Sequence, residues 1–228
     1  MANVLLITGP HGVGKGTQAY TISRHYGIPH ISTGQIFRDM VRHPDKVKYL
    51  PSKLVKTVKS FLEKGVYVSD EITNQVVEAR LFEKDCKKGF ILDGYPRTLQ
   101  QAEFLNGLLK KLGYGEYVVI NLVSDEDTLV KRQLYRVVCE NHGCGASYNT
   151  LLNKPKKDNI CDRCGSRLVS RSEDSEEGIR KRNEEYEKKA RPVVLYYKKI
   201  GKLIDVDGNG NPKKVFSRVK SILDKTSN

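Results

Sequence analysis

The feature that most constrains the fold is a glycine-rich stretch, residues 9–17, directly after the first apolar run of the chain. It has the sequence GPHGVGKGT, follows the apolar residues 4–8 and precedes a helical pattern over residues 15–26. When a strand, a loop and a helix follow one another in this way, backbone N–H groups and the positive end of the helix dipole converge on an anion. The stretch therefore predicts a phosphate-binding loop, in which Lys15 reaches the phosphates and Thr17 contacts the phosphates or a Mg²⁺ ion.

The loop departs from the strict pattern at one position, because Gly16 stands between Lys15 and the hydroxyl residue Thr17. The alternative is a glycine-rich turn that binds nothing. A strand, a six-residue loop, a lysine and a helix coincide here, and this coincidence favours the phosphate loop.

Short apolar runs alternate with longer helical patterns along the rest of the chain. The strands predicted with residues 4–8 are residues 90–92, 117–122 and 203–206, with a fifth near Ile31. The predicted helices are residues 15–26, 71–83, 99–111, 126–137, 176–188 and 212–223. Alternation of this kind predicts an α/β fold, with a parallel five-stranded sheet flanked by helices on both faces.

Two stretches break the alternation and are predicted to be insertions. Residues 35–68 have helical patterns without a strand for the main sheet, and residues 139–174 are rich in Cys, Gly, Asn, Lys and Pro. A chain of 228 residues suits one core with appended modules better than two full domains. We therefore predict a core of residues 1–34, 69–135 and 176–228.

The charge balance predicts a polyanionic partner. Lys and Arg number 40 against 27 Asp and Glu, a formal net charge of +13, which suits a nucleotide, a nucleic acid or a membrane surface. A solvated lysine-rich surface is the alternative for more than half of the lysines. The first apolar run is too short to span a membrane and lacks the features of a secretory leader, so we expect a cytoplasmic protein and no membrane partner.

Four of the five cysteines lie close together in the sequence and predict a metal site. Cys139, Cys144, Cys161 and Cys164 form two pairs, each followed by glycine, a spacing typical of structural zinc sites. Four thiolates leave no open position, so the zinc would fold a segment that has few apolar residues. Two disulfides, four idle thiols or a zinc ribbon that binds nucleic acid are the alternatives. Cys86 stands apart and is predicted to be a buried small hydrophobic residue.

Three segments resemble the adenylate kinases, a family of nucleoside monophosphate kinases, and the likeness extends over nearly the whole chain. Residues 9–18 (GPHGVGKGTQ) have the family's variant phosphate loop, residues 31–38 (ISTGQIFR) resemble its STGD segment, and residues 92–98 (LDGYPRT) resemble its DGFPRT segment. The cysteines between residues 139 and 164 are similar to those in the lid of the long-form members. The resemblance implies the fold of P-loop nucleoside triphosphatases, with residues 35–68 as a helical AMP-binding insertion and residues 136–175 as a zinc-binding lid.

The resemblance implies reversible phosphoryl transfer from ATP to AMP, giving two ADP, by a monomer that needs Mg²⁺ and holds structural Zn²⁺. The implied catalytic cations are Lys15, Arg97, Arg136, Arg171 and Arg182. The implied ATP site comprises Gly12, Val13, Gly14, Lys15, Gly16, Thr17, Arg132, Arg136, Ser147, Tyr148 and Gly210. The implied AMP site comprises Thr33, Gly34, Arg38, Val66, Tyr67, Val68, Gly94, Arg97, Gln101, Arg171 and Arg182. Asp93 is implied to hold water molecules of the Mg²⁺ shell.

One departure from the family concerns the metal. Gln35 stands where the family usually has Asp, so an acidic group near the metal and the phosphates is missing, and Mg²⁺ binding is expected to be weaker. The competing functions are phosphorylation of UMP or CMP, which the long lid disfavours, and an ATP-binding zinc protein that acts on nucleic acid. We do not expect a nucleic-acid partner, because the cysteine-rich segment offers only Tyr148 as an aromatic platform.

Overall fold

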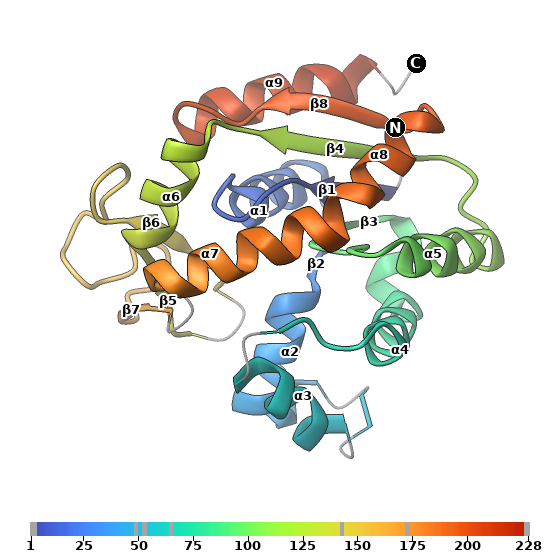
Figure 1. The fold of residues 1–228 in the computed structure, drawn as a ribbon, viewed down its shortest axis with the longest axis horizontal. Helices are drawn as coiled ribbons and strands as arrows, with labels where there is room; N and C mark the ends of the chain where they lie inside the picture. The colour runs from blue at the N-terminus through green and yellow to red at the C-terminus, as the bar shows by residue number, and fades with distance from the viewer. Residues whose placement is uncertain are drawn as a thin grey trace.

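The computed structural model of the chain describes residues 4–47, 50–51, 54–63, 66–141, 144–171 and 174–225. At its centre lies a five-stranded parallel sheet with the strand order β2-β3-β1-β4-β8 (Figure 1). The strands are β1 (Val4–Thr8), β2 (His30–Ser32), β3 (Phe90–Asp93), β4 (Tyr117–Val123) and β8 (Leu203–Asp207). The predicted parallel sheet is therefore confirmed, and three strands extend one residue beyond the predicted end.

The central strand β1 pairs with a neighbour on each side, and its side chains alternate between the two faces of the sheet. Val4 is paired with Phe90 of β3 and with Tyr117 of β4. Val4 and Leu6 belong to a buried cluster on one face, whereas Leu5 and Ile7 belong to a cluster on the other face. A strand buried on both faces needs a continuous apolar sequence, which is why this run could be recognised.

Helices cover both faces of the sheet and complete these two clusters. The first cluster includes apolar side chains of α2 (Thr33–Arg42), α4 (Asp70–Leu81), α5 (Leu99–Lys111) and α8 (Arg191–Lys199). The second includes those of α1 (Lys15–Tyr26) and α9 (Pro212–Lys225). Among the described residues, no helix combines the length and the apolar composition needed to cross a bilayer.

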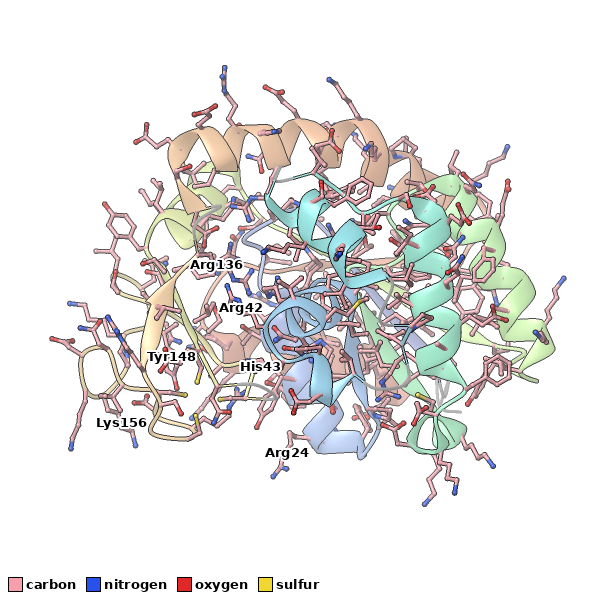
Figure 2. All side chains as sticks on the ribbon, turned by 90° about the horizontal axis from the view of Figure 1, so that it is seen from below. Arg24, Arg42, His43, Arg136, Tyr148 and Lys156 are labelled. Atoms are coloured by element: carbon pink, nitrogen blue, oxygen red, sulfur yellow. The ribbon has the colours of Figure 1, made fainter. Side chains whose placement is uncertain are left out.

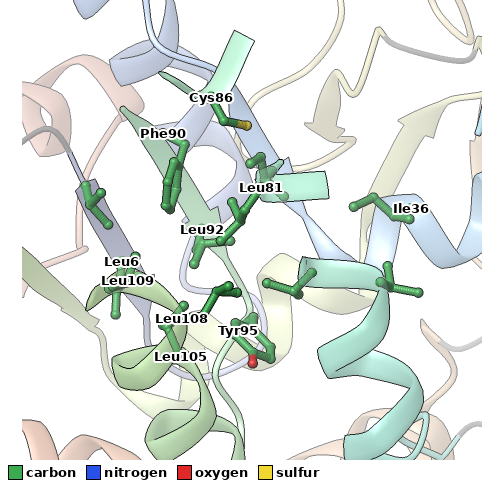
Figure 3. Close-up of a cluster of buried hydrophobic side chains, with 14 of the residues drawn as sticks. Leu6, Ile36, Leu81, Cys86, Phe90, Leu92, Tyr95, Leu105, Leu108 and Leu109 are labelled. Carbon is green, nitrogen blue, oxygen red and sulfur yellow. The ribbon is translucent and has the colours of Figure 1, made fainter. Parts of the chain in front are cut away.

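The larger cluster packs large side chains from the sheet against α5 (Figure 3). Leu6, Leu92, Leu105 and Leu109 are at most 1% exposed. Burying one such side chain contributes about 1.5–3 kcal/mol, so this layer fixes the strands whose ends carry the functional residues. Cys86 also lies in this cluster and is fully buried, as predicted.

The two predicted insertions contain the expected kinds of structure. Between α2 and α4 the chain forms a 3₁₀ turn (Pro44–Lys46) and helix α3 (Leu54–Glu63). Three later strands form an antiparallel sheet in the order β6-β5-β7, namely β5 (Arg136–Cys139), β6 (Ser147–Asn149) and β7 (Leu168–Ser170). We call residues 136–175 the cysteine segment.

The predicted helix over residues 126–137 is too long. Helix α6 spans Glu126–Leu134, and Arg136 is the first residue of β5, so Arg132 lies on the helix and Arg136 does not. Val137 pairs with Tyr148 on one side and Ser170 on the other. Strand pairing with these distant residues ends the helix, and the β-branched valines of this segment favour the strand.

The chain after the cysteine segment continues further in helical form than predicted. Helix α7 (Glu176–Glu185) passes through a π-helical turn (Tyr186–Ala190) into α8, which the sequence analysis did not anticipate. Figure 1 shows α7 crossing from the cysteine segment to the core. A further 3₁₀ turn (Lys84–Lys88) follows α4, which ends at Leu81, two residues before the predicted end.

Candidate functional site

The carboxyl ends of the parallel strands border a cavity of about 880 Å³. Residues that follow β1, β2 and β8 line it, together with Asp93 at the end of β3. The cysteine segment closes another part of its wall through β6 and the residues around it. Ligands of open α/β sheets bind at this edge, so the position of the cavity is the one expected of the predicted phosphate loop.

The backbone of the phosphate loop is held in a curled form. Gly12 has φ of +85°, and a Cβ atom there would lie 2.7 Å from the carbonyl oxygen of Leu129, so only glycine fits. Helix α1 begins directly after the loop, with Gly14 as its N-cap. The first N–H groups of α1 consequently face the cavity without a side-chain cap, which leaves them available to an anion.

Lys15 is held inside the loop by two carbonyl groups. Its Nζ donates to the carbonyl oxygens of Gly9 at 2.7 Å and Pro10 at 2.8 Å. Its position deep in the cavity lowers the pKa of Lys15 to about 7, since the attraction of Asp93 is outweighed by burial and by nearby arginines, of which Arg97 is the strongest. An anion bound beside it would reverse this effect and favour the charged ammonium.

Asp93, at the end of β3, is a buried carboxylate that stays ionised. Burial would raise its pKa, but a hydrogen bond from His30 and the charges of His30, Lys15 and Arg97 lower it. The His30 Nε2 atom lies 3.0 Å from the Asp93 Oδ2 atom. Asp93 therefore supplies a negative oxygen next to the phosphate loop, the type of group that Mg²⁺ and its water shell prefer.

A second group of residues lines the cavity beside α2 and the turn after β3. Arg97 donates through Nε to the carbonyl oxygen of Gly94 at 2.7 Å, and Thr33 donates to the same oxygen at 3.3 Å. The backbone N–H of Arg97 donates to the side chain of Gln101, whose Nε2 donates to Asp70 at 2.7 Å. These contacts fix the turn that carries the arginine before any ligand arrives.

Gln35 contacts the arginine of this second group. Its Nε2 donates to Asp39 Oδ1 at 2.9 Å, and its Oε1 accepts from Arg38 Nη2 at 3.0 Å. Arg38 lines the cavity, and Gln35 is outside the lining. The contacts of position 35 are thus with Arg38 and Asp39, and its effect on Mg²⁺ stays a prediction.

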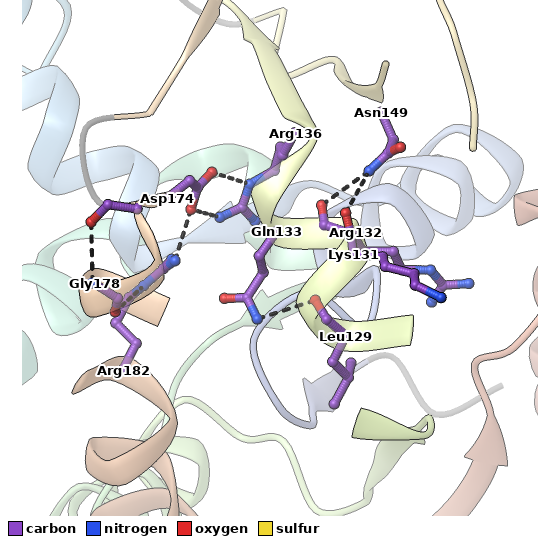
Figure 4. Close-up of polar contacts among 10 residues, drawn as sticks. Leu129, Lys131, Arg132, Gln133, Arg136, Asn149, Asp174, Gly178 and Arg182 are labelled. Atoms are coloured by element: carbon purple, nitrogen blue, oxygen red, sulfur yellow. Dashed lines mark hydrogen bonds and ion pairs between the residues drawn. The ribbon is translucent and has the colours of Figure 1, made fainter. Parts of the chain in front are cut away.

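Asp174 connects two of the predicted catalytic arginines (Figure 4). Its carboxylate accepts from Arg136 Nε at 2.7 Å and Nη2 at 2.5 Å, and from Arg182 Nη2 at 2.7 Å. The side chain of Asp174 is 3% exposed; burial would raise the pKa of its carboxyl group, but Arg136, Arg182 and Arg171 together lower it. A shared carboxylate of this kind keeps the guanidinium groups close together despite their mutual repulsion.

Arg132 joins the phosphate loop to the loop after β8. Its Nη1 donates to the carbonyl oxygens of Val13 at 3.3 Å and Gly208 at 3.0 Å, and its Nη2 donates to that of Gly210 at 3.1 Å. Burial lowers the pKa of Arg132, although it remains charged at any physiological pH. The guanidinium plane therefore forms a fixed part of the cavity wall.

All of the predicted nucleotide-site residues except Val66 line the one cavity. The sequence analysis missed other lining residues, among them His11, Arg42 and Lys59. Figure 2 shows the molecule from below and labels Arg42, Arg136 and Tyr148, which all line the cavity. Position 11 lies inside the predicted loop and could have been noticed there, whereas nothing in the local sequence distinguishes Arg42 and Lys59 from other surface cations.

The four predicted ligands of the cysteine segment come together in space. The Sγ atoms of Cys139, Cys144, Cys161 and Cys164 all lie within 4.8 Å of one another, with Cys139 and Cys164 at 3.4 Å and Cys144 and Cys161 at 3.7 Å. Tetrahedral zinc with Zn–S bonds of about 2.3 Å requires sulfur atoms about 3.8 Å apart. The donor set and its dimensions could therefore hold a metal ion, and they fit zinc.

The cysteine segment also contacts the core outside the cavity. Arg163, between two of the cysteines, lies over the ring of Tyr20 on α1, with its Cζ atom 3.4 Å from the ring centroid. The same guanidinium donates to the carbonyl oxygen of Cys144 at 2.5 Å. The stacked arginine thus depends on the loop that the cysteines shape.

Comparison with known proteins agrees with this architecture. Residues 7–202 match the family model of the adenylate kinases. The chain is 45% identical to an adenylate kinase of Caldanaerobacter subterraneus subsp. tengcongensis over 219 residues, 96% of this chain and 95% of that protein. It is 44% identical to an adenylate kinase of Archaeoglobus fulgidus, over 97% of this chain and 98% of that protein. It is also 44% identical to an adenylate kinase of Thermotoga neapolitana, over 98% of each protein. With a phosphate loop, a second cationic site and a four-cysteine segment around one cavity, this chain belongs to the adenylate kinase family.

Proposed function

We propose that the protein catalyses the reversible transfer of the γ-phosphoryl group of ATP to AMP, giving two ADP. The observation that carries the proposal is the convergence of four cations on a single cavity with room for two nucleotides. These cations come from four separate segments: Lys15, Arg97, Arg136 and Arg182. The charges of all four lower the pKa of the buried His11, and those of the three arginines lower the pKa of Lys15. Such a concentration of positive charge attracts several negative charges into the cavity, which the phosphates of two nucleotides would supply.

The ATP site is proposed to occupy the part of the cavity formed by the phosphate loop and the cysteine segment. The backbone of residues 12–17 would bind the phosphates, and Arg132 with Gly210 would lie against the adenine. Ser147 and Tyr148 line the cavity from β6 and would cover the nucleotide from the other side. The contacts of Arg132 with both neighbouring loops support this assignment.

The AMP site is proposed to occupy the part between α2, the turn after β3 and the residues before α4. Arg38 and Arg97 would bind its phosphate, while Thr33, Gly34 and Gln101 would contact the nucleoside. Because the amide of Gln101 already contacts Asp70 and the Arg97 backbone, a base edge would have to exchange with one of them. The backbone around Val66, which is outside the cavity lining, is proposed to contact the base only after residues 35–68 move toward it.

The proposed reaction requires positioning and charge compensation, with no covalent intermediate on the protein. Phosphoryl transfer proceeds in line, with negative charge spread over the equatorial oxygens, so fixed cations around those oxygens lower the barrier. Arg136, Arg171 and Arg182 would turn from Asp174 toward the transferring group when the phosphates arrive. Before the phosphates bind, the buried carboxylate of Asp174 would keep these arginines together.

Two metals accompany the proposed function. Asp93 would hold water molecules of the Mg²⁺ ion that arrives with ATP, and that ion would neutralise phosphate charge. The four cysteines would hold a structural zinc, because a closed thiolate shell leaves no position for a reactant.

The division of the chain proposed from the sequence suits this function. Residues 35–68 and 136–175 would close over the bound nucleotides, while the core of residues 1–34, 69–135 and 176–228 stays fixed. Closure would exclude water, which could otherwise accept the phosphoryl group. We propose a monomer in the cytoplasm, with ATP, AMP and ADP as its partners.

The first prediction is that the purified protein forms ADP from ATP and AMP in the presence of Mg²⁺, measured with a coupled ADP assay. UMP, CMP and a nucleic-acid substrate serve as alternative acceptors in parallel reactions. We expect AMP to be preferred by at least about tenfold in kcat/KM, which corresponds to about 1.4 kcal/mol of discrimination. A preference for UMP or CMP would contradict the proposed acceptor, and no ADP formation with any monophosphate would contradict the proposed reaction.

The second prediction concerns Arg97. Arg97→Ala should raise the KM for AMP by about 10- to 100-fold while leaving ATP binding within about twofold, because it removes a charged hydrogen-bonding group from the AMP phosphate alone. The measurement combines steady-state kinetics with titration of each nucleotide. Arg24→Ala, which removes an exposed arginine from α1, is the matched control. Equal weakening of both nucleotides would mean that Arg97 does not distinguish the two sites.

A further inference from the structure

His11, at the tip of the phosphate loop, contacts a residue from a distant part of the chain. Its Nε2 atom lies 3.3 Å from the hydroxyl oxygen of Tyr67, 56 positions away. Tyr67 belongs to the short segment between α3 and α4, and both side chains line the cavity. The phosphate-loop pattern of the family leaves position 11 unspecified, so the motif assigns no role to this histidine.

Tyr67 in turn lies against the arginine proposed to bind AMP. The Cζ atom of Arg97 is 4.6 Å from the centroid of the Tyr67 ring, within the range of a cation–π interaction. A guanidinium that also donates to the Gly94 carbonyl oxygen has two independent supports, one on its edge and one on its face. The Nζ atom of Lys189 lies 5.4 Å from the same ring, so cations from two elements meet at Tyr67.

We propose that His11 and Tyr67 are positioning residues, which hold Arg97 at a fixed place relative to the phosphate loop. The Tyr67 ring supports the guanidinium, and the hydrogen bond to His11 ties that ring to the loop that binds the donor nucleotide. This inference rests on the proposed function, because it assumes that Arg97 binds the acceptor phosphate. Transfer in line requires the two phosphates to be aligned within a fraction of an ångström, which a link between the two sites would provide.

The electrostatics of the cavity suit a neutral imidazole in this link. Burial and the positive charges around it, chiefly those of Lys15 and Arg97 and then of Arg182 and Arg136, keep the pKa of His11 well below its usual value. A neutral imidazole has one nitrogen that accepts a hydrogen bond, so the Tyr67 hydroxyl can donate to it. A charged side chain at position 11 would instead repel Arg97.

Removal of the Tyr67 ring tests the support of Arg97. Tyr67→Leu should raise the KM for AMP and lower kcat, so that kcat/KM for AMP falls about 3- to 30-fold, with ATP binding measured by titration unchanged. Tyr67→Phe keeps the ring and should recover most of the AMP affinity, because stacking needs only the aromatic face. Tyr135→Leu, at an exposed tyrosine outside the cavity, is the control for losing an aromatic side chain.

A double-mutant cycle tests the link to the phosphate loop. His11→Asn and Tyr67→Phe should each lower kcat by about 3- to 10-fold, the range of one lost hydrogen bond, and the double variant should be no slower than either alone. A merely structural role would change the melting temperature without this coupling in kcat, so thermal unfolding is measured for every variant.

The outcomes separate this inference from the proposed function. If the native protein forms no ADP from ATP and AMP, both the proposed function and this inference are refuted. If the native protein is active but Tyr67→Leu keeps native kinetics for AMP, or weakens ATP and AMP equally, Tyr67 does not position Arg97. If the effects of His11→Asn and Tyr67→Phe multiply in the double variant, the two residues act independently and the link is refuted.

Discussion

Lys15→Ala is expected to lower kcat by about 10³-fold or more while the protein remains folded. Lys15 is the cation that the phosphate loop directs into the cavity, held by the carbonyl oxygens of Gly9 and Pro10. Removing one preorganised charge-stabilising group from an active site costs about 10²–10³ in rate, and an ammonium among transferring phosphates belongs to the upper end of that range. Rates are measured at saturating ATP and AMP, with Lys87→Ala, which removes an exposed lysine, as the control. Turnover within tenfold of the native rate would contradict the role of the loop.

The same variant tests the electrostatics of the cavity without nucleotides. Lys15 has a pKa lowered to about 7 in the folded chain, against 10.5 for its ordinary value. Between these two values the unfolded chain binds more protons at this lysine than the folded chain does, so its contribution to stability rises with pH across that window. Thermal unfolding followed from pH 7 to pH 10 should show this rise in the native protein and less of it in Lys15→Ala. Identical pH dependence in both proteins would mean that the lysine is not buried among cations.

Removal of the metal from the cysteine segment is expected to give the largest loss of stability. A metal present at a thousandfold above its Kd stabilises the folded state by about 4 kcal/mol. For a chain of this size each kcal/mol changes the melting temperature by about 2–4 °C, so metal-free protein should melt about 8–16 °C lower. We expect about one zinc per chain after anaerobic purification, measured by elemental analysis. Protein that contains no tightly bound metal would contradict the assignment.

Two cysteine variants separate metal loss from the loss of a thiol. Cys161→Ser removes a buried ligand of the cluster and should release the metal, whereas Cys86→Ala removes a buried thiol elsewhere and should retain it. Loss of the metal should also free Arg163 from Tyr20, because the loop that carries this arginine is shaped by the cysteines. Nucleotide phosphate binding by the loop at residues 9–17 should persist, since the two sites share no ligand.

Local patterns in the sequence were sufficient for the sheet, the phosphate loop and the cysteine cluster. Residues 4–8 could be recognised as a central strand because burial on both faces demands an unbroken apolar run. The loop and its lysine could be recognised because strand, glycines and helix are consecutive in the chain, and the four cysteines because metal ligands recur at fixed short spacings. Each strand, the loop and the cysteine cluster is specified by a short stretch of consecutive residues, where periodicity and spacing can be read directly.

Only the tertiary structure determined the features that depend on contacts between residues far apart in the sequence. Arg136 lies in β5 and not on a helix with Arg132, because Val137 pairs with Tyr148 and Ser170, and no local pattern carries that pairing. The sequence likewise showed an excess of 40 basic over 27 acidic residues without showing which of them share one cavity. The contact of His11 with Tyr67, 56 residues apart, arises only when α3 and α4 bring Tyr67 to the end of β1. Hydrogen bonds and charge interactions act over a few ångströms in space, so the chain must fold before they select their partners.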